Sequence, residues 1–98
     1  MAKSRTLIIE KEGYFYLRNK MRQKMGYSIL SYETLNRLWG KFRFRNGGAN
    51  SKTHPISDNE IRIDNSTFLL SIEGVKEALE KEGLKYREDG YEEQYIFS

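Results

Sequence analysis

Three segments of this chain place their apolar residues at helical spacing, and a glycine follows each of them. Apolar residues three or four positions apart line one face of an α-helix, and glycine often ends a helix because it accepts a positive φ. The pattern predicts three amphipathic helices, over Tyr14–Met25 before Gly26, from the N-cap Ser31 to Gly40, and from the N-cap Ser71 to Gly83.

Four further segments have the patterns of β-structure. They are Thr6–Ile9, Lys41–Arg45, Glu60–Asp64 and the segment 84–97 around Asp89-Gly90. The second and third alternate strictly between apolar and charged residues, as half-buried strands do, so we expect them to pair with each other. The last contains an Asp-Gly pair, which favours a tight hairpin turn. The sequence therefore predicts an α+β fold with three helices, a short mixed or antiparallel sheet and a C-terminal β-hairpin, an order that resembles a winged helix.

The length of 98 residues allows one hydrophobic core but not two, so we predict a single domain over 1–98. Residues 1–4 are predicted to be a flexible tail, and the polar stretch 46–59 a mobile loop. The chain has no cysteine, which is typical of a small domain in a reducing cytoplasm. Its apolar runs are far shorter than a membrane span. We therefore expect a cytoplasmic protein without a membrane partner.

The charges are divided unequally along the chain. Residues 1–52 hold twelve Lys and Arg against three Glu, a net charge of +9, and residues 53–98 hold five against eleven acidic residues, a net charge of −6. Charge of one sign gathered in one region attracts partners of the opposite sign. We expect the first half to contact a polyanion, unless the acidic half folds over it and neutralises it. The bipolar distribution also suits a homo-oligomer.

The candidate nucleic-acid-binding residues of the basic half are Arg18, Lys20, Arg22, Lys24, Asn36, Arg37, Lys41, Arg43, Arg45 and Lys52. Cations contact phosphates without reading sequence. If Lys41–Arg45 is a strand, three cations lie on one face about 7 Å apart, a spacing that suits one nucleic-acid strand. The predicted function is a small, regulatory nucleic-acid-binding protein, with DNA favoured over RNA.

The segment Arg22–Arg37 resembles a helix-turn-helix, with Ser31–Arg37 as the recognition helix. The resemblance implies that Asn36 and Arg37 reach base edges. The sequence departs from the motif because Arg22 stands where a small residue is usual, and because the link between the helices is longer than the tight form. A winged helix would contact DNA through its last helix and hairpin, but these are acidic here and would repel phosphates.

The acidic end is the basis of the alternative function. Its candidate residues for a protein partner are Glu77, Glu80, Glu88, Glu92 and Glu93. In this alternative the protein is an interaction module or inhibitor of a nucleic-acid-handling complex, of the anti-defence kind that phages and other mobile elements encode.

An enzyme is the third hypothesis. His54 is the only histidine, so the chain cannot assemble a His cluster or a catalytic triad. A nuclease that uses His54 with Lys52 in the 46–59 loop is the remaining catalytic possibility. Asp58, Glu60 and Asp64 have oxygen ligands for a divalent ion, but Glu60 and Asp64 flank alternating isoleucines and fit an exposed strand face as well. We therefore expect no catalytic site, no metal and no cofactor.

Overall fold

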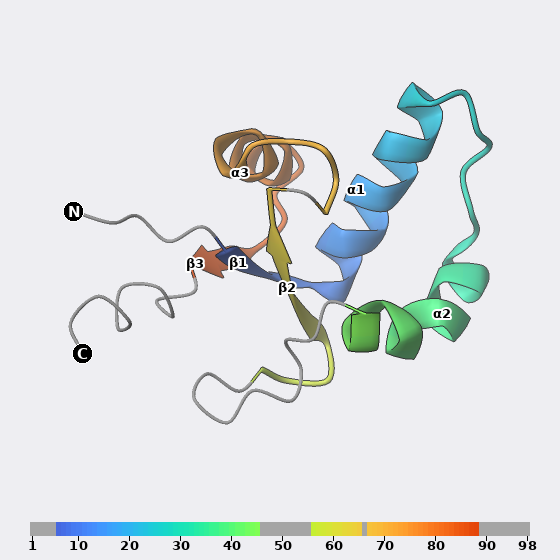
Figure 1. The fold of residues 1–98 in the computed structure, drawn as a ribbon, viewed down its shortest axis with the longest axis horizontal. Helices are drawn as coiled ribbons and strands as arrows, with labels where there is room; N and C mark the ends of the chain where they lie inside the picture. The colour runs from blue at the N-terminus through green and yellow to red at the C-terminus, as the bar shows by residue number, and fades with distance from the viewer. Residues whose placement is uncertain (1–5, 46–55, 66, 89–98) are drawn as a thin grey trace.

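The computed structural model describes residues 6–45, 56–65 and 67–88 of the chain, and they form three helices and a three-stranded antiparallel sheet (Figure 1). The elements in chain order are β1 (Thr6–Glu10), α1 (Lys11–Lys24), α2 (Tyr32–Arg45), β2 (Glu60–Asp64), α3 (Ile72–Lys81) and β3 (Tyr86–Glu88). The predicted α+β class is confirmed. None of the described helices is long and apolar enough to cross a membrane.

Strand β1 is the centre of the sheet, whose strand order is β2-β1-β3. Both neighbours run antiparallel to it, so that Ile8 lies opposite Arg62 on one side and Arg87 on the other. Three successive β1 residues, from Leu7 to Ile9, are buried, because the central strand is covered on both of its faces. The edge strand β2 buries only alternate residues. The predicted strands at 6–9 and 60–64 are thus confirmed.

Helix α1 follows β1 directly and begins three residues before the predicted start. Gly13 therefore lies inside the helix, where a Cβ would sit only 3.1 Å from the Cδ2 of Leu79 on α3. The missing side chain lets α1 and α3 pack closely. At the other end Gly26 has a φ of +86°, which confirms it as the residue that ends this helix.

The predicted strand over Lys41–Arg45 is wrong, and so is the predicted stop at Gly40. These residues continue α2, and β2 pairs with β1 instead. The alternating pattern requires Phe42 and Phe44 on the same face, but Phe42 is 4% exposed and Phe44 is 79% exposed. Phe42 extends the helical stripe of the buried residues Leu35 and Trp39, so tertiary packing keeps the segment helical through the glycine.

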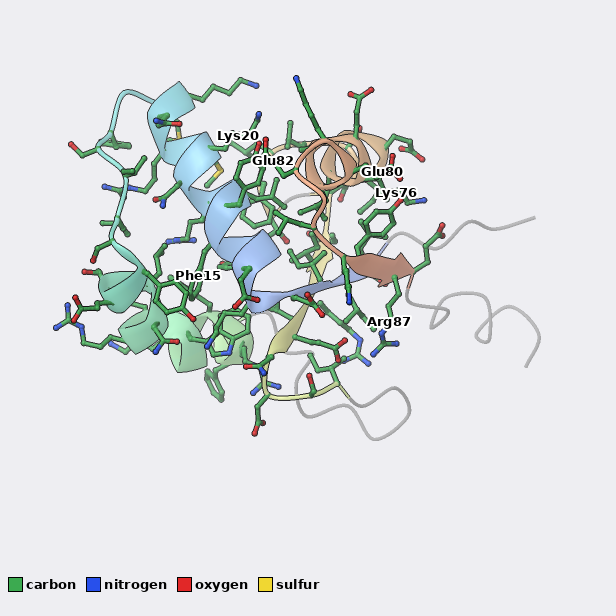
Figure 2. The ribbon with its side chains drawn as sticks, turned by 180° about the vertical axis from the view of Figure 1, so that it is seen from behind. Phe15, Lys20, Lys76, Glu80, Glu82 and Arg87 are labelled. Carbon is green, nitrogen blue, oxygen red and sulfur yellow. The ribbon has the colours of Figure 1, made fainter. Side chains whose placement is uncertain are left out.

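Aromatic rings join α1 to α2. The ring of Tyr14 lies 5.1 Å from Phe42, 5.1 Å from Phe68 and 5.8 Å from Trp39. Phe15, labelled in Figure 2, meets Trp39 edge to face at 5.6 Å. Such pairs contribute about 0.5–1.5 kcal/mol each beyond the area they bury. They fix the position of α2, and with it the side that α2 presents to solvent.

Helix α3 forms as predicted. The Oγ of Ser71 accepts a 3.0 Å hydrogen bond from the backbone N–H of Gly74, and Gly83 follows the helix with a φ of +71°. Figure 1 shows α2 and α3 on opposite sides of α1. Of the predicted hairpin, 86–88 forms β3, whereas 89–98 lies outside the described residues. The predicted tail and residues 46–55 of the predicted loop also lie outside them.

Candidate nucleic-acid interface

The ten predicted binding residues do not form one surface. Lys52 lies outside the described residues, and only the backbone of Arg45 is described. The other eight separate into three sets, according to whether they hold the fold together, lie beside α3, or point outward from α2.

Arg43 belongs to the first set, and its predicted place on a strand face is wrong, because it lies in α2. Its Nε donates to the backbone oxygen of Glu60 at 3.0 Å, and a terminal nitrogen donates to that of Ser57 at 2.8 Å. A second terminal nitrogen lies 3.7 Å from the carboxylate of Asp58, and the side chain is only 17% exposed. Arg43 therefore fastens α2 to the start of β2, and two of its donors are used within the fold.

Two arginines of α1 also have partners inside the protein. The guanidinium of Arg18 stacks over the ring of Phe42 at 4.3 Å, and one of its nitrogens donates to the hydroxyl of Tyr14 at 3.3 Å. The Nε of Arg22 donates to the backbone oxygen of Ser28 at 2.7 Å, which orders the link between α1 and α2. Cation–π and charge-assisted contacts of this kind stabilise the packing. Both side chains therefore act mainly in the fold.

Lys20 and Lys24 form the second set. Both are exposed on α1, on the side where α3 lies, as Figure 2 shows for Lys20. Lys20 lines an open hollow between the two helices together with Glu77 and Glu80 of α3. The acidic helix thus offsets part of the charge on this side of α1, as the self-neutralisation hypothesis requires.

The third set lies on the solvent side of α2. Its members are three or four positions apart, so they share one side of the helix. We call this surface the α2 face, and it consists of Asn36, Arg37, Gly40, Lys41 and Phe44, all exposed. The Oδ1 of Asn36 accepts a 3.0 Å hydrogen bond from Lys11, which leaves its amide N–H groups as donors.

Among the described residues, no carboxylate of the acidic half forms an ion pair with a cation of the α2 face. Ion pairs between described side chains include Arg43 with Asp58, Lys76 with Glu88, and Arg87 with Glu60. Within the described ranges, Arg37 contacts only the hydroxyl of Thr34, at 3.4 Å, and no carboxylate pairs with Lys41. In the part of the chain that the structure describes, the α2 face is therefore an exposed, positively charged surface.

Gly40 lies in the middle of this face. A Cβ added there would meet no described atom within 4 Å, and its φ is not positive. Glycine inside a helix costs about 0.5–1 kcal/mol relative to alanine. Neither the described packing nor the backbone conformation requires a glycine at this position.

The predicted acidic partner residues are engaged locally. The carboxylate of Glu80 accepts a hydrogen bond from the hydroxyl of Tyr86, and this bond raises the pKa of that phenol. The carboxylate of Glu88 accepts from Lys76 at 2.8 Å, which raises the pKa of the ammonium. Glu77 is exposed, whereas Glu92 and Glu93 lie outside the described residues. The carboxylates of Glu80 and Glu88 thus bridge α3 and β3.

Comparisons with known proteins leave the function to be inferred from these residues. Scans against protein-family models, curated proteins and solved structures found no significant match to this chain. No group of three or more His, Cys, Asp or Glu side chains is placed to hold a metal ion in the part that the structure describes. His54, the candidate nuclease residue, is outside that part.

Sequence reasoning missed two members of the α2 face. Gly40 is predicted as a stop and Phe44 as a core residue, because 41–45 has the pattern of a strand. The signal for both was the spacing of Leu35, Trp39 and Phe42, which continues one helical stripe past the glycine.

Proposed function

We propose that this protein binds nucleic acid, with DNA as the favoured target, through the α2 face. The observation that supports the proposal best is the pair Arg37 and Lys41, exposed and free of carboxylates in the described structure. Four residues of helix rise about 6 Å, so both cations can contact neighbouring phosphates of one strand. Two exposed cations of this kind attract a polyanion. In the unbound protein their exposure to water costs little free energy.

The neighbouring residues supply the other contacts such a surface needs. Gly40 leaves the helix backbone uncovered between the two cations, so a phosphodiester backbone can come closer there than over any other residue. Asn36 and Arg37 are side chains that read adenine and guanine edges. Phe44, 79% exposed, offers a ring on which a base can stack for about 1–3 kcal/mol.

The test of the proposal compares two double variants, each of which removes two cations from a different surface of the protein. The variant Arg37→Ala/Lys41→Ala changes the α2 face, and the matched control Lys81→Ala/Lys85→Ala removes the same charge from exposed positions in and after α3. Fluorescence anisotropy with labelled duplex and single-stranded DNA, and with RNA of the same sequence, gives the affinities. Circular dichroism checks that each variant is folded.

We expect the α2 variant to lose about tenfold or more in affinity for DNA and the control to stay within about twofold. Equal losses in the two variants would mean that only net charge matters, and the α2 face would lose its role. Absence of binding by the unmodified protein would contradict the proposal as a whole. Tighter binding of RNA would replace DNA by RNA as the target.

A second candidate function is the protein-interaction module of a nucleic-acid-handling complex, as mobile elements encode. It is favoured by an apolar groove on a different side of α1, lined by Met21, Met25 and the segment 68–70. Either function is expected in the cytoplasm, in keeping with a chain that has no cysteine.

The nuclease hypothesis stays a prediction, because His54 and Lys52 lie outside the described residues. Its test is the variant His54→Ala, which would abolish cleavage and leave binding intact. If the unmodified protein cleaves neither DNA nor RNA, the hypothesis is wrong.

A further inference from the structure

An apolar groove runs between the C-terminal half of α1 and the segment that leads into α3. Its apolar walls are Leu17, Met21, Met25, Phe68, Leu69 and Leu70. We call it the Leu69 groove. It encloses about 100 Å³, less than the ~150 Å³ of an apolar cavity that holds a benzene ring. The groove therefore has room for one aliphatic side chain.

Leu69 is the unusual residue of this groove. It is the one non-glycine residue with a positive φ in the described structure, at 59°, and its side chain is 74% exposed. Both features cost free energy in the isolated protein, because a left-handed conformation strains a residue with a Cβ and water surrounds an apolar side chain. Strain of this kind gathers at binding sites, where the surroundings hold it in place.

The neighbours of Leu69 impose its conformation. Phe68 is buried, and its ring lies 5.1 Å from that of Tyr14. The backbone N–H of Thr67 donates to the oxygen of Asp64 at 3.2 Å, and Ser71 caps α3. With the chain anchored on both sides, the side chain of Leu69 is held outward at the edge of the groove. Met25, on the opposite wall, is 56% exposed.

The charges around the groove define its partner. Lys20 and Lys24, one turn apart on α1, are the polar residues of its lining, and no described carboxylate lines it. Lys20 also lines the neighbouring hollow that contains Glu77 and Glu80 of α3, whereas Lys24 does not. A segment that inserts an aliphatic side chain here brings its flanking residues next to the two ammonium groups. Carboxylates at those flanking positions would form ion pairs, and cations would be repelled.

We propose that the Leu69 groove binds a short, acidic, amphipathic segment of a partner protein. One aliphatic side chain of the partner fills the hollow between Met25 and Leu69, and its flanking carboxylates pair with Lys20 and Lys24. A hollow for a single side chain suits a peptide anchor better than a lipid surface, which needs apolar groups that protrude together. This inference does not rest on the proposed function, because α1 packs against α2 through Phe15 and Arg18, on another of its sides.

The methyl groups of methionine report directly on the groove. The chain has three methionines, of which Met21 and Met25 line the groove. The intact protein, with 13C-labelled methionine methyls, is titrated with a synthetic helical peptide that has leucine at helical spacing and glutamate elsewhere. A peptide with lysine in place of glutamate is the control. We expect the Met21 and Met25 signals to shift with the acidic peptide and to stay in place with the basic one.

Two variants test the residues, and a third separates this site from the α2 face. Leu69→Gly removes one side chain from the wall of the groove. Glycine accepts the positive φ at this position, so the protein should remain folded. Lys20→Glu/Lys24→Glu reverses the charge of the two polar residues that line the groove. Each should weaken the acidic peptide by about tenfold, whereas Arg37→Ala/Lys41→Ala should bind it as the unmodified protein does. Thermal unfolding checks that each variant is folded.

Unchanged peptide affinity in both groove variants would overturn the proposal. So would the absence of shifts at Met21 and Met25, or equal shifts with the basic peptide. If anionic lipid vesicles shift these signals and the acidic peptide does not, the groove binds lipid and the proposal is wrong. Loss of DNA binding in the α2 variant has no bearing on these outcomes, so the two sites fail or succeed separately.

Discussion

Replacement of Gly40 by alanine should make the protein more stable and weaken its binding to nucleic acid. The added methyl group meets no described atom within 4 Å, and the backbone at this position does not need a positive φ. Alanine then gains about 0.5–1 kcal/mol over glycine in a helix interior. For a domain of this size each kcal/mol moves Tm by about 4–8 °C, so Gly40→Ala should raise Tm by about 2–8 °C.

The same methyl group projects into the space between Arg37 and Lys41, where the proposed phosphodiester backbone comes closest. We expect DNA affinity to fall about fivefold, which corresponds to about 1 kcal/mol. Thermal unfolding by circular dichroism and anisotropy with labelled DNA measure the two effects on the same sample. Opposite signs in stability and binding separate loss of contact from loss of folding.

The control is the same substitution at a glycine with a structural reason. Gly83 has a φ of +71°, so Gly83→Ala should lower the free energy of unfolding by about 1 kcal/mol and leave DNA binding unchanged. A fall in Tm with Gly40→Ala would refute the assignment of an uncovered helical glycine. A rise in Tm with full DNA affinity would refute the close approach of a partner at this position.

Three further substitutions test contacts that hold the fold. Arg43→Lys cannot reach both backbone oxygens that the guanidinium binds, those of Glu60 and Ser57, and urea unfolding should show a loss of about 1–3 kcal/mol; a loss under ~0.5 kcal/mol would contradict this role. The backbone N–H of Ser57 donates a hydrogen bond to the carboxylate of Glu60 and lowers its pKa from the usual 4.5. The ionised carboxylate therefore stabilises the fold at pH values above 4.5, and this stabilisation is lost as the pH falls below 4.5. Glu60→Gln should cost about 1 kcal/mol at pH 7 and less at pH 3, and an equal cost at both pH values would contradict this sign. Trp39→Phe removes a 2.7 Å hydrogen bond to the backbone oxygen of Asp58, and an unfolding free energy unchanged within ~0.5 kcal/mol would refute the expected loss of about 1 kcal/mol.

Elements with local signals could be predicted from the sequence. Ser71 caps α3 through an oxygen that reaches only three residues along the chain, and Gly83 ends it with a positive φ. The strand at 6–9 follows from a run of β-prone residues, and the strand at 60–64 from the alternation of isoleucine with charged residues. The segment 41–45 could not be assigned in this way, because five alternating residues fit a strand or a helix equally well. The contact of Phe42 with Tyr14, 28 residues away in sequence, decides between them.

The cations of the candidate site were visible in the sequence, but their separate roles were not. Arg43 is removed from the surface by backbone oxygens 14 and 17 residues away, and Arg18 by a ring on the next helix. Such contacts have no local signature, so a count of charges treats Arg43 and Lys41 alike. The same applies to Gly40. The sequence cannot show whether its neighbours leave room for a side chain, and only the described packing shows that they do.

The dependence of DNA binding on salt tests most directly whether the α2 face contacts phosphates. The logarithm of the binding constant falls linearly with the logarithm of salt concentration, by about 0.9 per phosphate contact on a duplex and about 0.7 on a single strand. If Arg37 and Lys41 each neutralise one phosphate, the slope for Arg37→Ala/Lys41→Ala should be shallower than that of the unmodified protein by about 1.4–1.8. Parallel lines for the two proteins would show that these cations contact no phosphate, and would contradict the account.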